Sequence, residues 1–320
     1  GASNTYIYIA IRRGPMKTPT TGTSVFSTST KQSTSPGYTS TFPVDLGFYR
    51  NKATAASWYL QDRLRGAIYL LTNATDAEVA DSVAKFDYQN GYYVSASANT
   101  DVFSWNFRRA PGFFDEVCYT GNSASSGTGN TQLITHNLTV APEMIIVKRR
   151  SGASDWIIWT PALGTTGYMY FDASAVMTAN PTYYFGTTGP TPTATQFKVG
   201  DAYYTNANGS TYTAYLFATC AGVSKVGTYT GTASTQTIDC GFTGGARFVL
   251  IKRTDSTGNW WVWDTARGMV AGADPRLPLN ATTAESNANW VYTTTGGFQI
   301  VTTDATVNAS GGSYIYLAVA

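Results

Sequence analysis

Groups that carry enzyme chemistry are scarce in this 320-residue sequence, which has one histidine, three cysteines and four glutamates. A Ser-His-Asp triad would have to use His136, and no GxSxG segment presents a nucleophilic serine. Zinc sites need clustered cysteine and histidine, and the sequence has no such cluster. It also has no glycine-rich phosphate loop. We therefore expect a protein that is not an enzyme and that uses no metal and no cofactor.

Charge of either sign is equally scarce. Charged residues make up 12% of the chain, and the net charge is +2 at pH 7, too little to neutralise a phosphate backbone. No apolar run approaches the roughly 20 residues that cross a bilayer. The N-terminal segment GASNTYIYIAIRR places its charges after the apolar part, the reverse of a signal peptide. We expect no nucleic-acid partner, no membrane insertion and no signal peptide.

The three cysteines, Cys118, Cys220 and Cys240, are odd in number and show no CxxC spacing. They are best interpreted as small buried side chains of a protein assembled in a reducing cytoplasm. A disulfide between two of them is the alternative.

Two kinds of chemistry leave little trace in sequence spacing and stay open. Loop oxygens of Asp172, Asp201 or Asp304 could bind calcium. Glycoside cleavage needs only two carboxyl groups that meet in space, for which Glu116 and Glu143 are the candidates. Glu78 and Glu285 are weaker candidates, because they share equivalent NAT-x-AE segments and a repeated position indicates a structural role.

Aromatic residues are plentiful, at 14% of the chain, and several of them repeat. A basic residue, a tryptophan and a glycine recur eight positions apart in three copies, which identifies a repeat protein. The second and third copies are offset by 104 positions, since 148 + 104 = 252. The triplets are Arg50, Trp58 and Gly66, then Lys148, Trp156 and Gly164, then Lys252, Trp260 and Gly268.

Short strands fill the repeats, because aromatic and β-branched runs alternate with segments rich in glycine, serine and asparagine. One aromatic-rich strand occurs four times, at Thr5–Ile11, Asp101–Phe107, Thr211–Phe217 and Ser313–Val319. A buried strand, MIIVKRR or FVLIKRT, leads through a polar turn into a return strand, DWIIWT or NWWVWD, which predicts a hairpin. Only 77–85 has a modest helical pattern.

These patterns predict an all-β protein of three tandem antiparallel β-sandwich domains of the jelly-roll type. The expected domains are residues 14–109, 110–220 and 221–320, and residues 1–13 form the last strand of a preceding repeat whose body is absent. A β-propeller is the competing architecture. Its blades repeat at about 40 to 50 residues, and we do not expect three blades to close.

Within the triplet, the tryptophan is most simply a core residue. Trp159 and Trp263 lie three positions beyond it and therefore face the other side of the strand. We expect the basic residue to reach solvent or a local carboxylate such as Asp62 or Asp264, in a surface ion pair worth at most about 1 kcal/mol. The triplet then belongs to the scaffold of each strand-turn-strand unit.

Recognition is therefore expected where the copies differ. Trp261 is the first candidate, because the equivalent positions hold Ile157 and Tyr59. The unmatched loops at 181–195 and 269–278 add Tyr183, Tyr184 and Arg276 as candidate binding residues.

The strings VLIKRTDSTGNWWVWDTARG, TTDATVNASGGSYIYLAVA and YIYIAIRRGP resemble the repeated module of tail-associated virion proteins from tailed phages, especially those of marine and cyanobacterial hosts. The resemblance covers nearly the whole chain. Unit one lacks the Tyr-Thr-Gly motif of the other two units, and unit two lacks NAT-x-AE. The resemblance implies a virion protein assembled in the host cytoplasm, with a structural or host-adhesion role and no catalytic residues.

The first hypothesis is a tail fibre or related appendage that binds host-surface glycans or proteins by multivalent contacts. Its expected partners are other copies of itself, most simply in a trimer, and other virion proteins. A purely structural shaft, tube or capsid-decoration protein is the alternative. A polysaccharide depolymerase is the third and weakest hypothesis.

Overall fold

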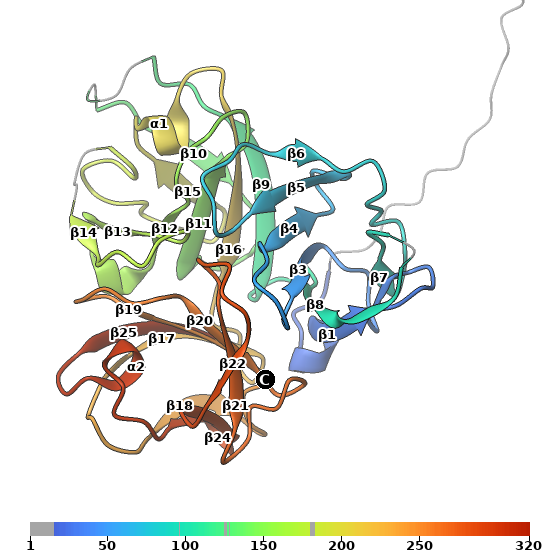
Figure 1. Cartoon of the computed structure of the whole chain (residues 1–320). Helices are drawn as coiled ribbons and strands as arrows, with labels where there is room; N and C mark the ends of the chain where they lie inside the picture. Colours follow the sequence, from blue (N-terminus) through green and yellow to red (C-terminus); the bar gives the residue numbers. More distant parts are fainter. Residues whose placement is uncertain (1–15, 96, 125–126, 128, 180–182) are drawn as a thin grey trace, which may run out of the picture.

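Three β-structured units surround a common centre in the computed structural model, which describes residues 16–95, 97–124, 127, 129–179 and 183–320 (Figure 1). Each unit contributes one six-stranded antiparallel sheet, and the three sheets have the same strand order. The all-β prediction is confirmed. The predicted strand Thr5–Ile11 and the predicted boundary at 1–13 lie outside the described residues.

Unit one is ordered β1-β8-β3-β4-β5-β6 in its main sheet, with a separate β2-β7 pair. Its elements are η1 (Gly22–Ser24), β1 (Phe26–Lys31), β2 (Tyr38–Thr39), β3 (Leu46–Asn51), β4 (Tyr59–Asp62), β5 (Ile68–Leu71), β6 (Val79–Ala80), β7 (Gly91–Tyr92) and β8 (Asn99–Phe107).

Unit two repeats the order as β9-β16-β11-β12-β13-β14, with a β10-β15 pair. Its elements are β9 (Phe114–Thr120), β10 (Gln132–Thr135), β11 (Met144–Arg149), β12 (Ile157–Trp159), η2 (Pro161–Leu163), β13 (Gly167–Tyr170), β14 (Thr178–Ala179), β15 (Gln196–Val199), α1 (Tyr203–Asn206) and β16 (Thr211–Phe217).

Unit three follows as β17-β25-β19-β20-β21-β22, with a small β18-β24-β23 sheet. Its elements are β17 (Ser224–Thr230), β18 (Gln236–Phe242), β19 (Phe248–Arg253), β20 (Trp261–Asp264), β21 (Asp274–Pro278), β22 (Ser286–Ala288), β23 (Val291–Thr294), β24 (Gly296–Ile300), α2 (Ala305–Asn308) and β25 (Ser313–Val319).

The predicted strands and hairpins occur at their expected places. The repeated aromatic strand is β8, β16 and β25, and the buried strand with its return strand is β11 with β12 and β19 with β20. The modest helical pattern at 77–85 does not give a helix, because this stretch contains β6, which pairs with β5. The Glu78 N–H, just before β6, binds the Arg150 carbonyl of unit two at 3.0 Å, so contact with a neighbouring unit overrides the weak helical pattern.

All three main sheets turn one face to the same hydrophobic core. Phe48 and Phe107 of unit one, Phe217 of unit two and Phe248 of unit three belong to a single cluster of buried side chains. The rings of Phe107 and Phe217 lie 5.8 Å apart, and those of Phe107 and Phe248 lie 5.7 Å apart. The arrangement is a three-sided prism, and it differs from a tandem array of separate domains because none of the inner faces is covered within its own unit.

The outer face of each main sheet has its own covering and its own cluster. The β2-β7 pair accompanies a cluster that contains Tyr38 and Tyr92, and the larger clusters of units two and three contain Trp159 and Trp263. As predicted, Trp156 and Trp159 face opposite sides of one strand. Trp156 is buried in the core shared with the neighbouring units, and Trp159 is buried in the outer cluster of its own unit. Each unit is therefore two-layered.

The three units close into a ring. Gly22, at the start of unit one, lies against the last residue of unit three, and a Cβ atom built on Gly22 would fall 1.8 Å from the Ala320 carbonyl oxygen. The Arg247 side chain of unit three also donates to the Phe26 carbonyl of unit one at 3.2 Å. At the centre of the ring, residues from all three units enclose an apolar cavity of about 40 Å³.

Candidate functional site

The repeated tryptophans join each unit to the previous one. Each indole lies in the shared core and donates its N–H to a backbone carbonyl of another unit. The bonds are Trp58 to Pro278 at 2.8 Å, Trp156 to Leu71 at 2.9 Å and Trp260 to Tyr170 at 2.9 Å. The three acceptors occupy equivalent positions on β21, β5 and β13. The bonds form a closed cycle around the ring.

The basic residue of the triplet does not reach solvent, contrary to the prediction, since Arg50, Lys148 and Lys252 are all fully buried. Each side chain donates to carbonyl oxygens of the neighbouring unit. The bonds are Arg50 to Ala281 at 3.3 Å and Thr282 at 3.0 Å, Lys148 to Thr75 at 2.8 Å, and Lys252 to Ser174 at 3.3 Å. Burial lowers the pKa of Arg50 to about 10 and the pKa of each lysine to about 8.

The glycine of the triplet is required by backbone geometry. Gly66, Gly164 and Gly268 have φ angles of 71°, 69° and 111°, a region that residues with a Cβ atom avoid. All three members of the triplet are therefore parts of the scaffold, which agrees with the sequence interpretation.

The NAT-x-AE segment of units one and three has a counterpart in unit two. Asn73 and Asn280 accept the backbone N–H of Trp58 and Trp260 through their side-chain oxygens, at 2.7 and 2.8 Å. In unit two, Asp172 accepts the N–H of Trp156 in the same way at 3.2 Å. Burial and the nearby Asp155 carboxylate raise the pKa of Asp172 to about 7.

Asp62 and Asp264 do not pair with the basic residue of the triplet, as expected from the sequence, but with another arginine. Asp62 binds Arg65 at 2.5 Å, and Asp264 binds Arg267 at the same distance, with all four side chains almost fully buried. The pairs therefore lie in the interior, where losing one partner costs far more than it does at the surface. Each carboxylate also accepts a bond from another unit, from Tyr215 at 2.6 Å or Trp105 at 2.8 Å.

A glutamate completes both buried networks. Glu78 lies 3.8 Å from Arg65 and binds Arg150 of unit two at 2.7 Å. Glu285 binds Arg267 at 2.7 Å.

Unit two carries uncharged residues at every equivalent position. In unit two, Thr160 replaces the aspartate, Leu163 replaces the arginine and Met177 replaces the glutamate. The hydrogen-bond donor is replaced as well: Leu317 of unit three occupies the strand position that Tyr215 and Trp105 hold in the other two units. The Met177 N–H binds the Thr254 carbonyl at 3.0 Å, matching the bond from Glu78 to Arg150. The interface between units two and three therefore lacks both the buried carboxylate and the side chain that would donate a hydrogen bond to it.

Glu116 and Glu143, the candidates for glycoside cleavage, lie in different surroundings. Glu116 is 1% exposed, and neither carboxyl oxygen has a hydrogen-bond partner among the described residues. Burial, together with Asp62 and Asp45, raises its pKa well above the ordinary value. Glu143 is partly exposed and accepts the N–H of Thr219 at 2.7 Å. The carboxyl group of Glu116 is therefore closed to a polysaccharide chain in this conformation.

The outer faces of the main sheets differ between units. One position holds Tyr59, Ile157 or Trp261, which pairs with Leu71, Tyr170 or Pro278 on the next strand. Two residues before that partner, on the same face of the sheet, stand Tyr69, Tyr168 or Arg276. In unit one the rings of Tyr59 and Tyr69 meet edge to face at 5.1 Å. These are the positions that the sequence comparison selected in unit three.

Unit three brings Trp261 and Arg276 together with a third residue, Trp290. The Arg276 guanidinium carbon lies 4.8 Å from the centre of the Trp261 ring and 3.3 Å from that of Trp290. The two indoles meet edge to face at 5.8 Å, and all three side chains are partly exposed. We refer to Trp261, Arg276 and Trp290 as the Trp–Arg cluster.

Asp274 positions this cluster. Its buried carboxylate accepts the indole N–H of Trp263 at 2.8 Å and the backbone N–H groups of Trp290 and Val291 at 2.8 and 2.9 Å. The predicted loop at 269–278 is thus partly strand, because its second half is β21. Sequence comparison missed Trp290, which follows β22 in a segment without a matching tryptophan in the other units.

The other two candidate binding residues lie in unit two and do not join the cluster. Tyr184 is 7% exposed and packs against Tyr168 at 4.1 Å between ring centres, so it belongs to the outer core. Tyr183 is 36% exposed. Pro181, the first residue of the predicted loop, lies outside the described residues.

The loop aspartates considered for calcium take part in backbone hydrogen bonds. Asp201 accepts the Gly129 N–H at 2.7 Å, and Asp304 accepts the Thr306 N–H at the start of α2 at 2.8 Å. Within the described ranges, no group of three or more metal-ligating side chains comes together. His136 is buried, with its Nδ1 atom 3.2 Å from the Leu138 N–H.

The three cysteines are free. Cys220 and Cys240 are buried as expected, whereas Cys118 is exposed. Of the helices among the described residues, none is long and apolar enough to cross a bilayer.

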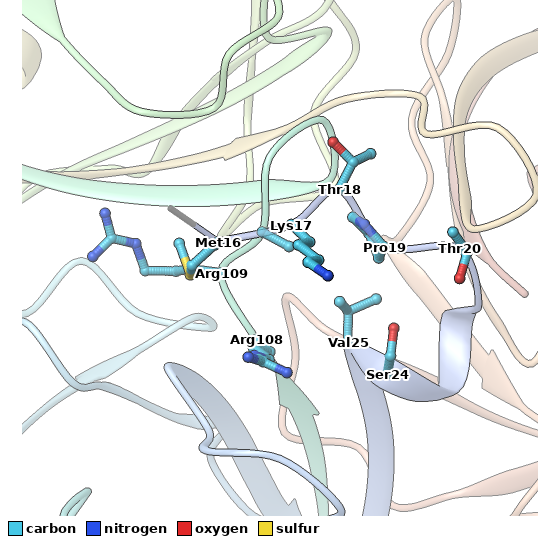
Figure 2. A pocket seen from close by; sticks show the side chains of 10 residues that line it. Met16, Lys17, Thr18, Pro19, Thr20, Ser24, Val25, Arg108 and Arg109 are labelled. Atoms are coloured by element: carbon cyan, nitrogen blue, oxygen red, sulfur yellow. The ribbon is translucent and has the colours of Figure 1, made fainter. Parts of the chain in front are cut away.

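A basic pocket of about 470 Å³ lies where the segment joining units one and two meets the start of the described chain. Its lining includes Lys17, Arg108, Arg109 and the Ser24 hydroxyl. Figure 2 shows the Arg109 side chain extending away from Lys17 and Arg108, and this arginine binds Asp115 at 2.7 Å. The positive charge left in the pocket is that of Lys17 and Arg108.

Residues 21–320 match the family described as "Domain of unknown function (DUF7483)", and the chain belongs to this family. A single family match thus spans all three units and begins next to Gly22, where the ring begins. No curated protein that was compared with the sequence matches it.

Proposed function

We propose that this protein is a non-enzymatic adhesion module of a tailed-phage virion, in a tail fibre or related appendage, and that it binds glycans or proteins of the host surface. The observation that carries the proposal is a contrast between the triplet scaffold and the outer sheet faces. The basic residue, the tryptophan and the glycine of the triplet recur in all three units, whereas the equivalent outer position holds the partly exposed Tyr59 or Trp261 or the buried Ile157. Side chains that vary on a fixed scaffold are typical of recognition surfaces.

The ring favours multivalent binding. Each unit is a two-layered sandwich, and the shared core holds the three outer faces at fixed directions. A receptor array that reaches two faces, or two copies of the chain, would bind more tightly through effective concentration. We further propose that the protein acts as a homo-oligomer, most simply a trimer, together with other virion proteins. The resemblance of its repeated strings to tail-associated virion proteins supports this location.

A glycan array that includes bacterial lipopolysaccharides and capsular polysaccharides tests the proposal. The protein should first be assembled, with its oligomeric state measured by light scattering. Binding to a restricted set of glycans, stronger for the oligomer than for the single chain, is the expected result. If the assembled oligomer binds no glycan and no host-cell surface, the adhesion proposal fails and a purely structural shaft, tube or decoration protein takes its place.

A further inference from the structure

We propose that the cavity at the centre of the ring is a dry binding site for one small apolar guest, such as a xenon atom. The cavity has a volume of about 40 Å³ and an apolar wall. Because a space of about 10–15 Å³ already accommodates a body of the size of a water molecule, this cavity is large enough to be occupied. The inference does not depend on the adhesion proposal, which concerns the outer faces.

The wall of the cavity comes from equivalent positions of all three units. One of these positions lies two residues before the basic residue of the triplet, on β3, β11 and β19, and is held by Phe48, Ile146 and Leu250. Every side chain of the wall is buried. The cavity therefore lies where the three main sheets meet, and its wall belongs to the shared core.

The space arises because equivalent positions carry side chains of unequal size. Thr72, Phe171 and Leu279 are equivalent, since the N–H of each binds the carbonyl of the triplet tryptophan in its own unit. All three line the cavity, but only Phe171 supplies a ring. Tyr215 and Leu317 share a second position in the wall, and again only one of them is aromatic. The smaller side chains leave open a space that protein interiors normally fill.

Water is not a suitable guest, because the wall offers it no free hydrogen-bond donor. A buried water molecule makes about three hydrogen bonds, and apolar cavities without such partners stay dry. Three side chains of the wall carry a donor, and each uses it outside the cavity. The bonds are Thr72 to the Leu279 carbonyl at 2.8 Å, Tyr215 to the Asp62 carboxylate at 2.6 Å and Trp156 to the Leu71 carbonyl at 2.9 Å.

An apolar guest needs no such partner. Atoms that line an empty space lack contacts on one side, and a polarizable guest restores these contacts by dispersion. Closed cavities lined by leucine, isoleucine and phenylalanine bind xenon and small hydrocarbons for this reason. Because the wall is buried, the guest enters when the core opens locally and briefly. Each chain has one cavity of this kind, at the centre of its ring.

Titration of the full chain with dissolved xenon tests the inference. Leucine and isoleucine methyl groups are labelled with carbon-13 and followed by NMR under xenon pressure, with helium at the same pressures as the control for compression. The methyl signals of Ile146, Leu250 and Leu317 should shift along one saturable curve with xenon and not with helium. Those of Leu133, which is 59% exposed, should show no saturable shift.

Variants that fill the cavity locate the guest. Leu279→Phe and Leu317→Phe each introduce a ring where unit two has Phe171 or Tyr215, and each should weaken xenon binding by about tenfold or more, because the guest loses its space and its contacts. Leu133→Phe is the matched control, since it makes the same change at an exposed position, and its xenon affinity should stay within about twofold of the unsubstituted protein. Thermal unfolding checks that each variant is folded, because an added ring can overpack a core.

Each contrary outcome has a distinct meaning. If the central methyl groups show no saturable shift, the cavity does not bind an apolar guest and the inference fails. Equal xenon affinity in a folded cavity-filling variant and in Leu133→Phe would place the guest elsewhere and overturn the site. Magnetisation transfer from water to the central methyl groups, measured without xenon, would show that the cavity is hydrated and overturn its dry state. If neither cavity-filling variant folds, the methyl titration of the unsubstituted protein still decides.

Discussion

Units one and two meet across a buried aspartate, an arginine and a tyrosine, whereas units two and three carry threonine and two leucines at the equivalent positions. At the first interface Asp62 binds both Arg65 and Tyr215. At the second, Thr160, Leu163 and Leu317 occupy these places. The same scaffold therefore accepts either a complete ionic network or an uncharged set, but both members of each contact change together.

The energetic reason is desolvation. Burying a carboxylate and a guanidinium costs several kcal/mol per ion, which their attraction and added hydrogen bonds must offset. A complete network and an apolar replacement can then be similar in stability, whereas half of a network is strongly unfavourable. The interface between units three and one contains an ionic network like that of units one and two, formed by Asp264, Arg267 and Trp105.

Breaking one ionic network should give the largest effect. Asp62→Ala leaves Arg65 and Tyr215 buried without their acceptor, and we expect it to lower the free energy of unfolding by about 3–5 kcal/mol. Thr160→Ala, at the equivalent position of the uncharged interface, should cost under about 1 kcal/mol. Urea unfolding of both variants measures the difference. Equal losses would show that the ionic network has no special role.

Exchanging the whole set sharpens the comparison. A variant with Asp62→Thr, Arg65→Leu, Glu78→Met, Arg150→Thr and Tyr215→Leu gives the interface of units one and two the residues found between units two and three. Its free energy of unfolding should lie within about 1–2 kcal/mol of that of the unsubstituted protein and well above that of Asp62→Thr alone. If the variant with five substitutions is as unstable as Asp62→Thr alone, the two sets of residues are not equivalent and the comparison of the interfaces fails.

A smaller effect is expected from a substitution that makes unit two resemble its neighbours. Asp172→Asn introduces the residue that Asn73 and Asn280 provide elsewhere, and its amide can still accept the Trp156 N–H. The raised pKa of Asp172, about 7, means that the folded state binds more protons than the unfolded state between about pH 4 and 7. The contribution of this residue to stability is therefore lost as the pH rises through 7.

Asp172→Asn should accordingly stabilise the protein by about 1–2 kcal/mol above pH 7 and by little near pH 4. Thermal unfolding across this pH range measures the effect. Asn73→Asp is the reciprocal control and should destabilise the protein at neutral pH. A gain for Asp172→Asn that is independent of pH would contradict the role assigned to the carboxylate.

The repeated elements were predictable because the signal lies within each unit. The repeated aromatic-rich run identified β8, β16 and β25, and the three-residue spacing of Trp156 and Trp159 placed their rings on opposite faces of one strand. The sequence did not predict what covers the inner face of this strand. Trp156 donates its indole N–H to the Leu71 carbonyl of unit one, and no local sequence pattern specifies a partner so far away in the chain. The separate-domain expectation missed the shared core for this reason.

The candidate site was predictable in part. Differences between copies identified Trp261 and Arg276, which the structure brings together. Trp290 was not found, because its place depends on Asp274 two strands away. The partner of Asp62 was mistaken because strand-end charges suggested Arg50, whereas the tight turn places Arg65 only three positions away.

The meeting of Gly22 and Ala320 has a consequence for how many units this ring can hold. An open solenoid can gain or lose a repeat at its ends, since each repeat contacts only its neighbours. Here the indole of Trp58 reaches back to Pro278 of the last unit, so every copy has two neighbours and the count is locked at three. Duplication of one more unit would have to break this circle, whereas exchange of side chains on the outer faces leaves it intact. A closed ring of this kind can therefore change its binding properties by substitution of outer side chains, but not by the addition of repeats.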